Sequence, residues 1–287
     1  MDGRPAPHSD HPLALAFSAR VGTAADPRLA AAMTQLVGAF ADIIDSTDAT
    51  RADLRTVIGF LTDVGEACSE QRQEWVLLAD AFGLTSLVET RMARRPAGAT
   101  PNTMPGPFYR AGAPRRPEGA SISIDGQGEP LLFAGQVTDV AGVPVAGAEI
   151  EVWQANGDGL YENQEPDRQP EFNLRGIYRS GADGEVTIRT VRPAGYPIPA
   201  DGPVGQLLAR MGIGLRRPAH LHFRVTAPGF QRLTTHVFDQ DDPSIDADPL
   251  FAVHPALTTR FVPQSDGGLR ASYKFVLTPA VQGNIDI

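Results

Sequence analysis

The pattern of hydrophobic and polar positions divides the chain into a helical part and a β-rich part. Between residues 26 and 95, apolar side chains recur three and four positions apart, which is the spacing of one helix face. From residue 121 onward, short runs rich in Val, Ile, Thr and aromatic residues are separated by turn-forming residues, which is typical of a β-sandwich. We therefore expect a mainly β protein with an α-helical N-terminal segment.

Two start signals and two apolar stripes define the expected helices. Asp26 before Pro27 predicts a capped first turn, and Thr50 with Asp53 resembles a capping box. A third helix is expected in QEWVLLADAFG, ending at Gly83. The stripes consist of Leu29, Met33, Leu36, Phe40 and Ile43, and of Leu54, Val57, Leu61, Val64 and Cys68. Such stripes need a partner, so the segment is either a plain helical subdomain or a helix–helix dimer contact.

The positions of Pro and Gly complete the predicted domain boundaries. We expect a flexible leader over 1–25, a helical dimerisation domain over 26–95, a Pro/Gly-rich linker over 96–120 and a β-sandwich catalytic domain over 121–287. The expected strands lie in residues 121–125, 131–140, 148–155, 185–191, 220–227, 232–238 and 271–278. Two long irregular excursions, over 156–179 and 192–214, are of a length that is usually functional.

Charge and composition exclude several classes of protein. The 287 residues carry a net charge of −9, so an electrostatic grip on nucleic acid is not expected. Cys68 is the only cysteine, which excludes an internal disulfide and favours a reducing compartment. We see neither a run of about 18 apolar residues nor a secretory signal, so we expect no membrane span and a cytoplasmic location.

The candidate chemistry begins with the stretch RPAHLHFRVTAPG. In a strand, His220 and His222 share one face, which is a good geometry for chelating a transition metal, although two partly exposed polar residues would give the same pattern. No Glu follows the pair, so a cupin-like site finds no support. Tyr161 in NGDGLYENQ and Tyr196 in RPAGYPIP lie in Gly-bearing loops, where a core tyrosine is poorly placed.

These segments, with WQANGDGLY, FNLRGIYRS, PAGYPIPADGPVG and LTTHVF, resemble the intradiol ring-cleavage dioxygenases over most of residues 105–260. The resemblance implies one mononuclear non-haem Fe(III) per subunit, held by Tyr161, Tyr196, His220 and His222. It implies that a small aromatic diol or triol is cleaved with O2 to a cis,cis-muconate, with Tyr196 accepting a substrate proton and Arg217 stabilising negative charge. It extends to the helical segment, which in the catechol-type branch forms a homodimer and often encloses a lipid.

Within that family, the helical segment indicates the catechol, chlorocatechol or hydroxyquinol branch, and two features favour hydroxyquinol. His236 stands where catechol-type members typically have Gln, and Asp80 could accept a hydrogen bond from a third ring hydroxyl. A solvated acid on a helix face is the other interpretation of Asp80. The further pocket residues implied are Leu77, Pro105, Gly106, Pro107, Phe108, Ile198, Pro199 and Leu250. Pro105 departs from the larger residue found in hydroxyquinol relatives, which leaves substituted catechols open.

Two readings from other classes compete with the dioxygenase. One is a metal-free β-sandwich binding module that kept the scaffold, because fold does not imply function. The other is a zinc hydrolase that uses His220, His222 and His236, which lacks a general-base Glu at a suggestive spacing.

Overall fold

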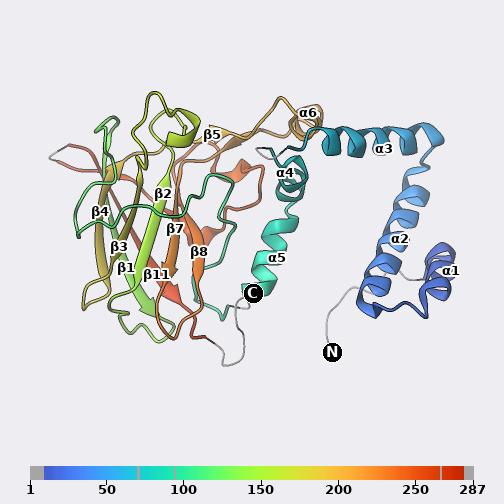
Figure 1. The fold of residues 1–287 in the computed structure, drawn as a ribbon, viewed down its shortest axis with the longest axis horizontal. Coiled ribbons are helices and arrows are strands. Elements are labelled where there is room, and N and C mark those ends of the chain that lie inside the picture. The colour runs from blue at the N-terminus through green and yellow to red at the C-terminus, as the bar shows by residue number, and fades with distance from the viewer. Residues whose placement is uncertain (1–9, 70–71, 94, 266, 281–287) are drawn as a thin grey trace. The chain divides into compact units, whose positions relative to one another are not determined.

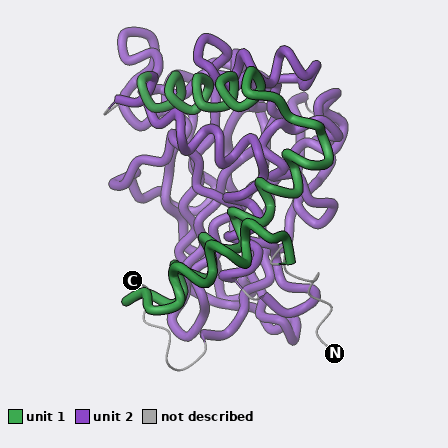
Figure 2. Tube along the Cα trace, turned by 90° about the vertical axis from the view of Figure 1, so that its right-hand side faces the viewer, with its two compact units in different colours: residues 1–66 green, residues 67–287 purple. Residues whose placement is uncertain are grey.

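The helices before residue 67 form a unit of their own. The computed structural model of the chain describes residues 10–69, 72–93, 95–265 and 267–280. It divides into two compact units, residues 1–66 and 67–287 (Figure 2). The first unit contains α1 (Pro12–Val21), α2 (Pro27–Thr47) and α3 (Arg51–Glu66).

Both predicted helix starts are confirmed. The Asp26 side chain accepts the backbone N–H of Leu29 at the start of α2. Before α3, the Thr50 backbone N–H donates to Asp53 Oδ2 at 2.8 Å and the Asp53 N–H donates to Thr50 Oγ1 at 3.3 Å. These side chains satisfy N–H groups that have no partner within a first turn.

Residues 12–21 depart from the prediction of a flexible leader over 1–25, because they form α1. His11 caps this helix by accepting the N–H of Leu13, Pro12 occupies the first turn, and α1 packs against α2. Residues 1–9 of the predicted leader lie outside the described residues.

The apolar stripe of α2 is exposed. The exposed fractions of Leu29, Met33, Leu36, Phe40 and Ile43 range from 39% to 57%. The buried positions of α2 are instead Thr34, Gly38 and Ala41. Although the sequence predicted no span, α2 is the one helix in the described ranges that is long and apolar enough to cross a membrane by length and composition.

In its described residues, the second unit has three α-helices. The predicted third helix is α4 (Glu74–Ala81), which ends before Gly83 at a φ of +70°. It is followed at once by α5 (Leu84–Ala93), and α6 (Pro203–Arg210) lies within the excursion that was expected to be irregular. Pro203 at the first position of α6 supplies the start signal that the prediction overlooked.

The rest of the second unit is a sandwich of two sheets, as predicted (Figure 1). One sheet has the order β10 (Val262–Pro263), β11 (Leu269–Leu277), β1 (Pro130–Asp139), β4 (Glu185–Val191). The other has the order β3 (Arg175–Arg179), β2 (Glu149–Gln154), β7 (His220–Thr226), β8 (Leu233–Asp239), β9 (Thr258–Thr259). A small ladder joins β5 (Tyr196–Pro197) to β6 (Arg216–Arg217), and single 3₁₀ turns occupy Glu162–Gln164, Ile245–Ala247 and Pro255–Leu257.

The core fills the space between the two sheets. Phe133 of β1, Phe223 of β7 and Phe275 of β11 meet there, with ring centroids 4.8 to 6.2 Å apart. All three are fully buried, so this cluster anchors the inner face of β7.

Two strand predictions need correction. Residues 121–125 form no strand, because Ser121 makes only an isolated bridge to Arg189 while Ile122 inserts into the core. The excursion over 156–179 instead contains β3, whose sequence RGIYR pairs with β2 despite its two charged ends. In both places the hydrogen bonding to a neighbouring strand determines whether a strand forms, and the local apolar pattern does not predict it.

The Pro/Gly-rich stretch 96–120 carries no helix or strand and runs against the second sheet. The Thr103 N–H donates to the Thr234 carbonyl, and the Thr234 N–H donates to Asn102 Oδ1. These bonds hold the stretch beside β8, where it reaches the candidate site.

Candidate metal centre

Strand β7 separates a core face from a polar face along its length. Leu221, Phe223 and Val225 are fully buried in the sandwich core. His220 and His222 point to the opposite face, as the alternation predicts, yet they are only 2% and 1% exposed. The interpretation as partly exposed polar residues is therefore wrong, and the pair lies in a closed site.

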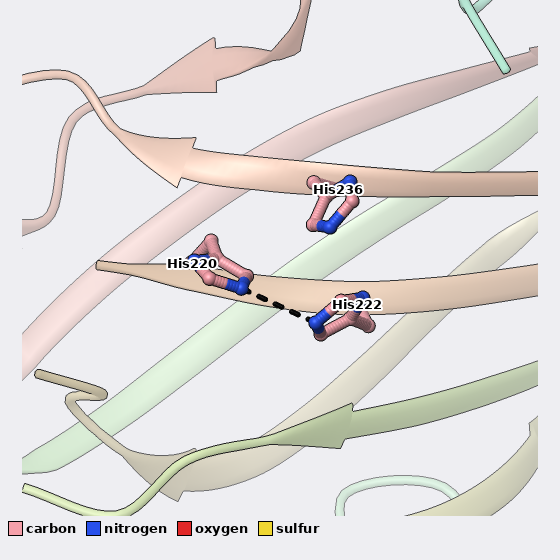
Figure 3. Close-up of side chains that lie close together, drawn as sticks. All are labelled: His220, His222 and His236. Atoms are coloured by element: carbon pink, nitrogen blue, oxygen red, sulfur yellow. Dashed lines mark hydrogen bonds between the residues drawn. The ribbon is translucent and has the colours of Figure 1, made fainter. Parts of the chain in front are cut away.

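A third imidazole joins this pair from the neighbouring strand. His236 of β8 lies directly opposite His222 in the antiparallel register, with ring centroids 4.2 Å apart. One nitrogen from each of His220, His222 and His236 lies within 4.8 Å of the others (Figure 3). On the other side, Trp153 of β2 pairs with His222 and stacks on its ring at 4.9 Å.

The segments that carry Tyr161 and Tyr196 cross in close contact with each other. The Ala194 N–H donates to the Asn156 carbonyl, which ties the Tyr196 loop to the Tyr161 loop. At the crossing, Gly159 has a φ of +84°, and a Cβ there would lie 3.0 Å from both the Gly195 carbonyl and Tyr196 Cβ. Only glycine fits such a close approach in this conformation.

Both phenols converge on the histidine pair. The Tyr196 hydroxyl lies 3.4 Å from His220 Nε2, and His220 Nε2 lies 3.2 Å from His222 Nε2. Ring centroids place Tyr161 5.8 Å from Tyr196 and 6.4 Å from His222. Phe108 stacks on Tyr161 at 4.5 Å and lies edge-on to Tyr196 at 6.2 Å.

Hydrogen bonding and burial leave imidazole nitrogens with lone pairs that can bind a metal. His220 Nδ1 lies 2.7 Å from the Pro218 carbonyl and donates to it, so its Nε2 carries the lone pair. Burial lowers the pKa of all three histidines well below the usual value, and the nearby Arg217 lowers each of them further. These imidazoles are therefore neutral, which is the form that binds a metal.

Tyr161 shows most directly that the residues fit a cation. Its hydroxyl is fully buried and makes no hydrogen bond of good geometry within the described residues. Burial, and then the neighbouring Tyr196, raise the pKa of Tyr161 well above the usual value. A phenol in such a place ionises only opposite a strong positive charge, and a hard trivalent ion such as Fe(III) suits a phenolate.

A buried ion pair stands beside this group. Arg217 of β6, directly opposite Tyr196 in the β5–β6 ladder, donates from Nε to Asp248 Oδ1 at 3.1 Å. Both side chains are 2% exposed, and one terminal nitrogen of Arg217 has no hydrogen-bond partner in the described ranges. Arg217 therefore keeps a donor available for an oxygen that enters the site.

Asp80 of α4 is buried at 7% exposure, so the interpretation as a solvated acid is wrong. Burial raises its pKa, while Thr85 and Arg217 act in the opposite direction. Its Oδ1 has no hydrogen-bond partner within the described part of the chain.

The other predicted pocket residues are placed unevenly. A Cβ on Gly106 would lie 3.3 Å from His222, so the 106–108 segment borders the histidines. Ile198 and Leu250 are buried, Leu77 is half-buried, and Pro105, Pro107 and Pro199 are exposed. Their pocket roles stay predictions.

Three contacts in the site were not anticipated from the sequence. Trp153 against His222, Asp248 against Arg217 and Thr103 against His236 all depend on pairing between distant segments. A signal existed only for Trp153, because it alternates with core residues along a strand.

Comparisons with known proteins agree with this geometry. The family described as "Dioxygenase" matches residues 104–279, and the one described as "Catechol dioxygenase N terminus" matches residues 26–100. A hydroxyquinol 1,2-dioxygenase of Rhizobium sp. (strain MTP-10005) is 46% identical over 85% of this chain and 82% of the relative. A 6-chlorohydroxyquinol 1,2-dioxygenase of Cupriavidus pinatubonensis is 40% identical over 96% of this chain and 99% of the relative.

A solved structure is similar in fold as well as in sequence. The hydroxyquinol 1,2-dioxygenase from Pseudomonas putida DLL-E4 superposes with a TM-score of 0.89 at 38% identity. The match covers 93% of this chain and 97% of that structure.

The buried histidines predict an acid-sensitive fold for the metal-free chain. The unfolded chain protonates each imidazole near pH 6.5, whereas the folded chain holds the three pKa values well below that. Below about pH 6.5 the unfolded state binds more protons, so the free energy of unfolding falls by up to about 1.4 kcal/mol per pH unit for each imidazole. Urea titrations in chelator between about pH 7.5 and 5.5, followed by tryptophan emission, measure this slope. His236→Gln should flatten it, and equal slopes would contradict the prediction.

Proposed function

The chain belongs to the family of intradiol ring-cleavage dioxygenases, and from this premise we propose that it cleaves hydroxyquinol or a close catechol between two adjacent hydroxyls. Both atoms of O2 enter the product, so hydroxyquinol gives 3-hydroxy-cis,cis-muconate, the tautomer of maleylacetate. The observation that carries the proposal is the convergence of two phenols on two imidazoles in one buried site. As a family member the chain is an enzyme, which removes the alternative of a binding module without catalysis.

Non-haem iron is the metal of this family, and we propose one Fe(III) per subunit with Tyr161, Tyr196, His220 and His222 as ligands. The support is the donor set, because two phenolates are hard anions that favour the trivalent ion over the divalent one. Once bound, the iron would supply a Lewis acid that the catechol chelates and that draws electron density from the ring.

The two tyrosines have different roles in this proposal. Tyr161 is fully buried and stacked under Phe108, so it stays in place. Tyr196 is half-buried and touches Phe108 only edge-on, at 6.2 Å, so its hydroxyl has room to move and to accept a proton from the substrate. Arg217, held by Asp248, directs its free nitrogen to negative charge that develops on the ring.

Asp80 supports hydroxyquinol as the substrate. A buried carboxylate oxygen without a partner is costly unless a ligand hydroxyl pairs with it, and the third hydroxyl of hydroxyquinol is such a donor. The related enzymes that are named for hydroxyquinol and 6-chlorohydroxyquinol support the same substrate. Catechol or chlorocatechol, which lack that hydroxyl, are the alternative substrates. Because Pro105 replaces the larger residue of hydroxyquinol relatives, substituted catechols are tested as well.

The exposed stripe of α2 supports a homodimer through the helices of 26–66. A row of exposed apolar side chains of this length is unusual on a monomer and fits a second copy of the same helix. The cytoplasm is the proposed location, because the sequence has a single cysteine and the substrates are small and diffusible.

The ligand assignment predicts a coloured protein that two substitutions bleach. Tyr161→Phe and Tyr196→Phe should each weaken the tyrosinate-to-iron absorption band and lower turnover by more than about a hundredfold, because a direct ligand matters more than its support. Visible spectra, iron analysis and oxygen uptake measure these effects. Tyr178→Phe is the matched control, since that buried hydroxyl donates to the Ala120 carbonyl within the sandwich. Colourless wild-type protein with stoichiometric zinc would reject the assignment.

Asp80 should decide the choice of ring. We expect wild-type enzyme to prefer hydroxyquinol over catechol, and Asp80→Ala to lose about tenfold or more in kcat/KM on hydroxyquinol only, the cost of an unpaired buried hydroxyl. Asp80→Asn keeps an acceptor oxygen and should lose less. Steady-state rates on hydroxyquinol, catechol and 4-chlorocatechol test this, and an unchanged preference in Asp80→Ala would defeat the hydroxyl-recognition argument.

The dimer should depend on the apolar stripes. Phe40→Asp combined with Leu54→Asp should reduce the solution mass from twice the chain mass to 30.6 kDa, because charges buried in an apolar contact lack partners. Light scattering after size exclusion gives the mass. Thr56→Asp, on the opposite face of α3, should leave the dimer intact, and a monomeric wild type would refute the proposal.

A further inference from the structure

The stretch 96–120 places one hydroxyl against a histidine of the site. Thr103 Oγ1 lies 2.6 Å from His236 Nδ1, and the two residues are 133 positions apart in the sequence. Thr103 is 6% exposed and His236 is fully buried, so water does not compete for this bond. The Thr103 backbone is fixed as well, because its N–H donates to the Thr234 carbonyl two residues before His236.

We propose that the Thr103 hydroxyl holds His236 with its proton on Nε2, which makes His236 a hydrogen-bond donor to a substrate oxygen and removes it from the metal ligands. Thr103 is thus a positioning residue that acts through His236. The inference rests on the proposed function and assigns a role within the same site.

The direction of the bond follows from counting donors. Within the described residues, His236 Nδ1 is the only hydrogen-bond partner recorded for the Thr103 hydroxyl. If Nδ1 carried the proton, the ring would donate to Oγ1 and the hydroxyl proton would be left buried without an acceptor, a cost of about 1 to 3 kcal/mol. If the hydroxyl donates to Nδ1, both groups are satisfied. Nδ1 is then the unprotonated nitrogen, and the ring proton lies on Nε2.

The neighbouring His220 has the opposite arrangement. Its Nδ1 donates to the Pro218 carbonyl, which leaves a lone pair on Nε2, the atom nearest to Tyr196 and His222. His236 has the same burial and the same cluster around it, but an Nε2–H cannot coordinate a metal. The hydrogen-bond partner at Nδ1 thus determines the role of each imidazole: His220 can bind the metal through Nε2, and His236 can donate a hydrogen bond from Nε2.

The Nε2–H of His236 needs an acceptor that the chain does not provide. Nε2 is buried and has no hydrogen-bond partner within the described ranges. A ligand of the site must place an oxygen there, and a phenolic or phenolate oxygen of an aromatic diol or triol has the required chemistry. The bond would be strongest to an ionised oxygen, so it contributes most to the bound, deprotonated substrate.

The test removes the hydroxyl from the holoenzyme. Thr103→Val should keep the full iron content and the colour, yet weaken anaerobic binding of hydroxyquinol by about tenfold or more, the usual effect of losing the support of a functional histidine. Titration of the visible band with hydroxyquinol, without O2, gives the affinity. Thr103→Ser retains the hydroxyl and should stay within about twofold of wild type, since the same bond is made.

Two further variants separate this role from a structural one. Thr235→Val deletes a neighbouring buried hydroxyl that bonds to the Pro101 carbonyl between the same two segments, and it should leave the affinity unchanged. His236→Gln should retain iron, and Thr103→Val should have no further effect on affinity in that background, because the two residues act as one unit. Wild-type affinity in Thr103→Val, additive effects of the two substitutions, or loss of iron in His236→Gln would each overturn the inference. Wild-type protein without iron or hydroxyquinol cleavage would instead refute the proposed function.

Discussion

The site depends on the two-residue alternation of β7, which is buried on both faces for different reasons. The inner face carries Phe223 into an aromatic core that couples the two sheets. The register of β7 is therefore fixed, because a shift of one residue would exchange the side chains of the core with those of the site. His220 and His222 are therefore held by hydrophobic packing on the far side of the same strand, which fixes their separation before any ligand binds.

Strand β7 supplies two of the four proposed donors, and the other two come from segments that are fixed to each other. The crossing at Gly159 and the bond from Ala194 to Asn156 make the Tyr161 and Tyr196 loops a single element. The β5–β6 ladder then connects Tyr196 to Arg217, which lies three residues before His220. One continuous path of backbone contacts thus joins both phenols to the imidazole strand, so the loops gain the precision that isolated loops lack.

The sequence was informative where one segment carries its own pattern. The alternation of β7 and the caps at Asp26 and Thr50 are local, and the structure has them as predicted. The prediction of Tyr161 and Tyr196 as site residues came from a family resemblance, because a Gly-bearing loop indicates only that a tyrosine is poorly placed for the core. The contact of Thr103 with His236 could not be predicted, because it depends on which residue of an irregular stretch lies beside β8. The strand over 175–179 and the helix over 12–21 were missed because pairing and packing outweighed weak local signals.

Charge in the buried site is balanced by a small number of groups, and this restricts what the site can bind. Arg217 lowers the pKa of all three imidazoles, Arg175 also lowers that of His222, and Asp248 pairs with Arg217 through Nε. Asp80 is a further acid of the site, and its burial opposes ionisation while Arg217 favours it. Arg217 and Arg175 both favour the ionised form of Tyr161, so the site stabilises negative charge on an oxygen. The cations that help to keep the imidazoles neutral therefore also favour a negatively charged oxygen in the site.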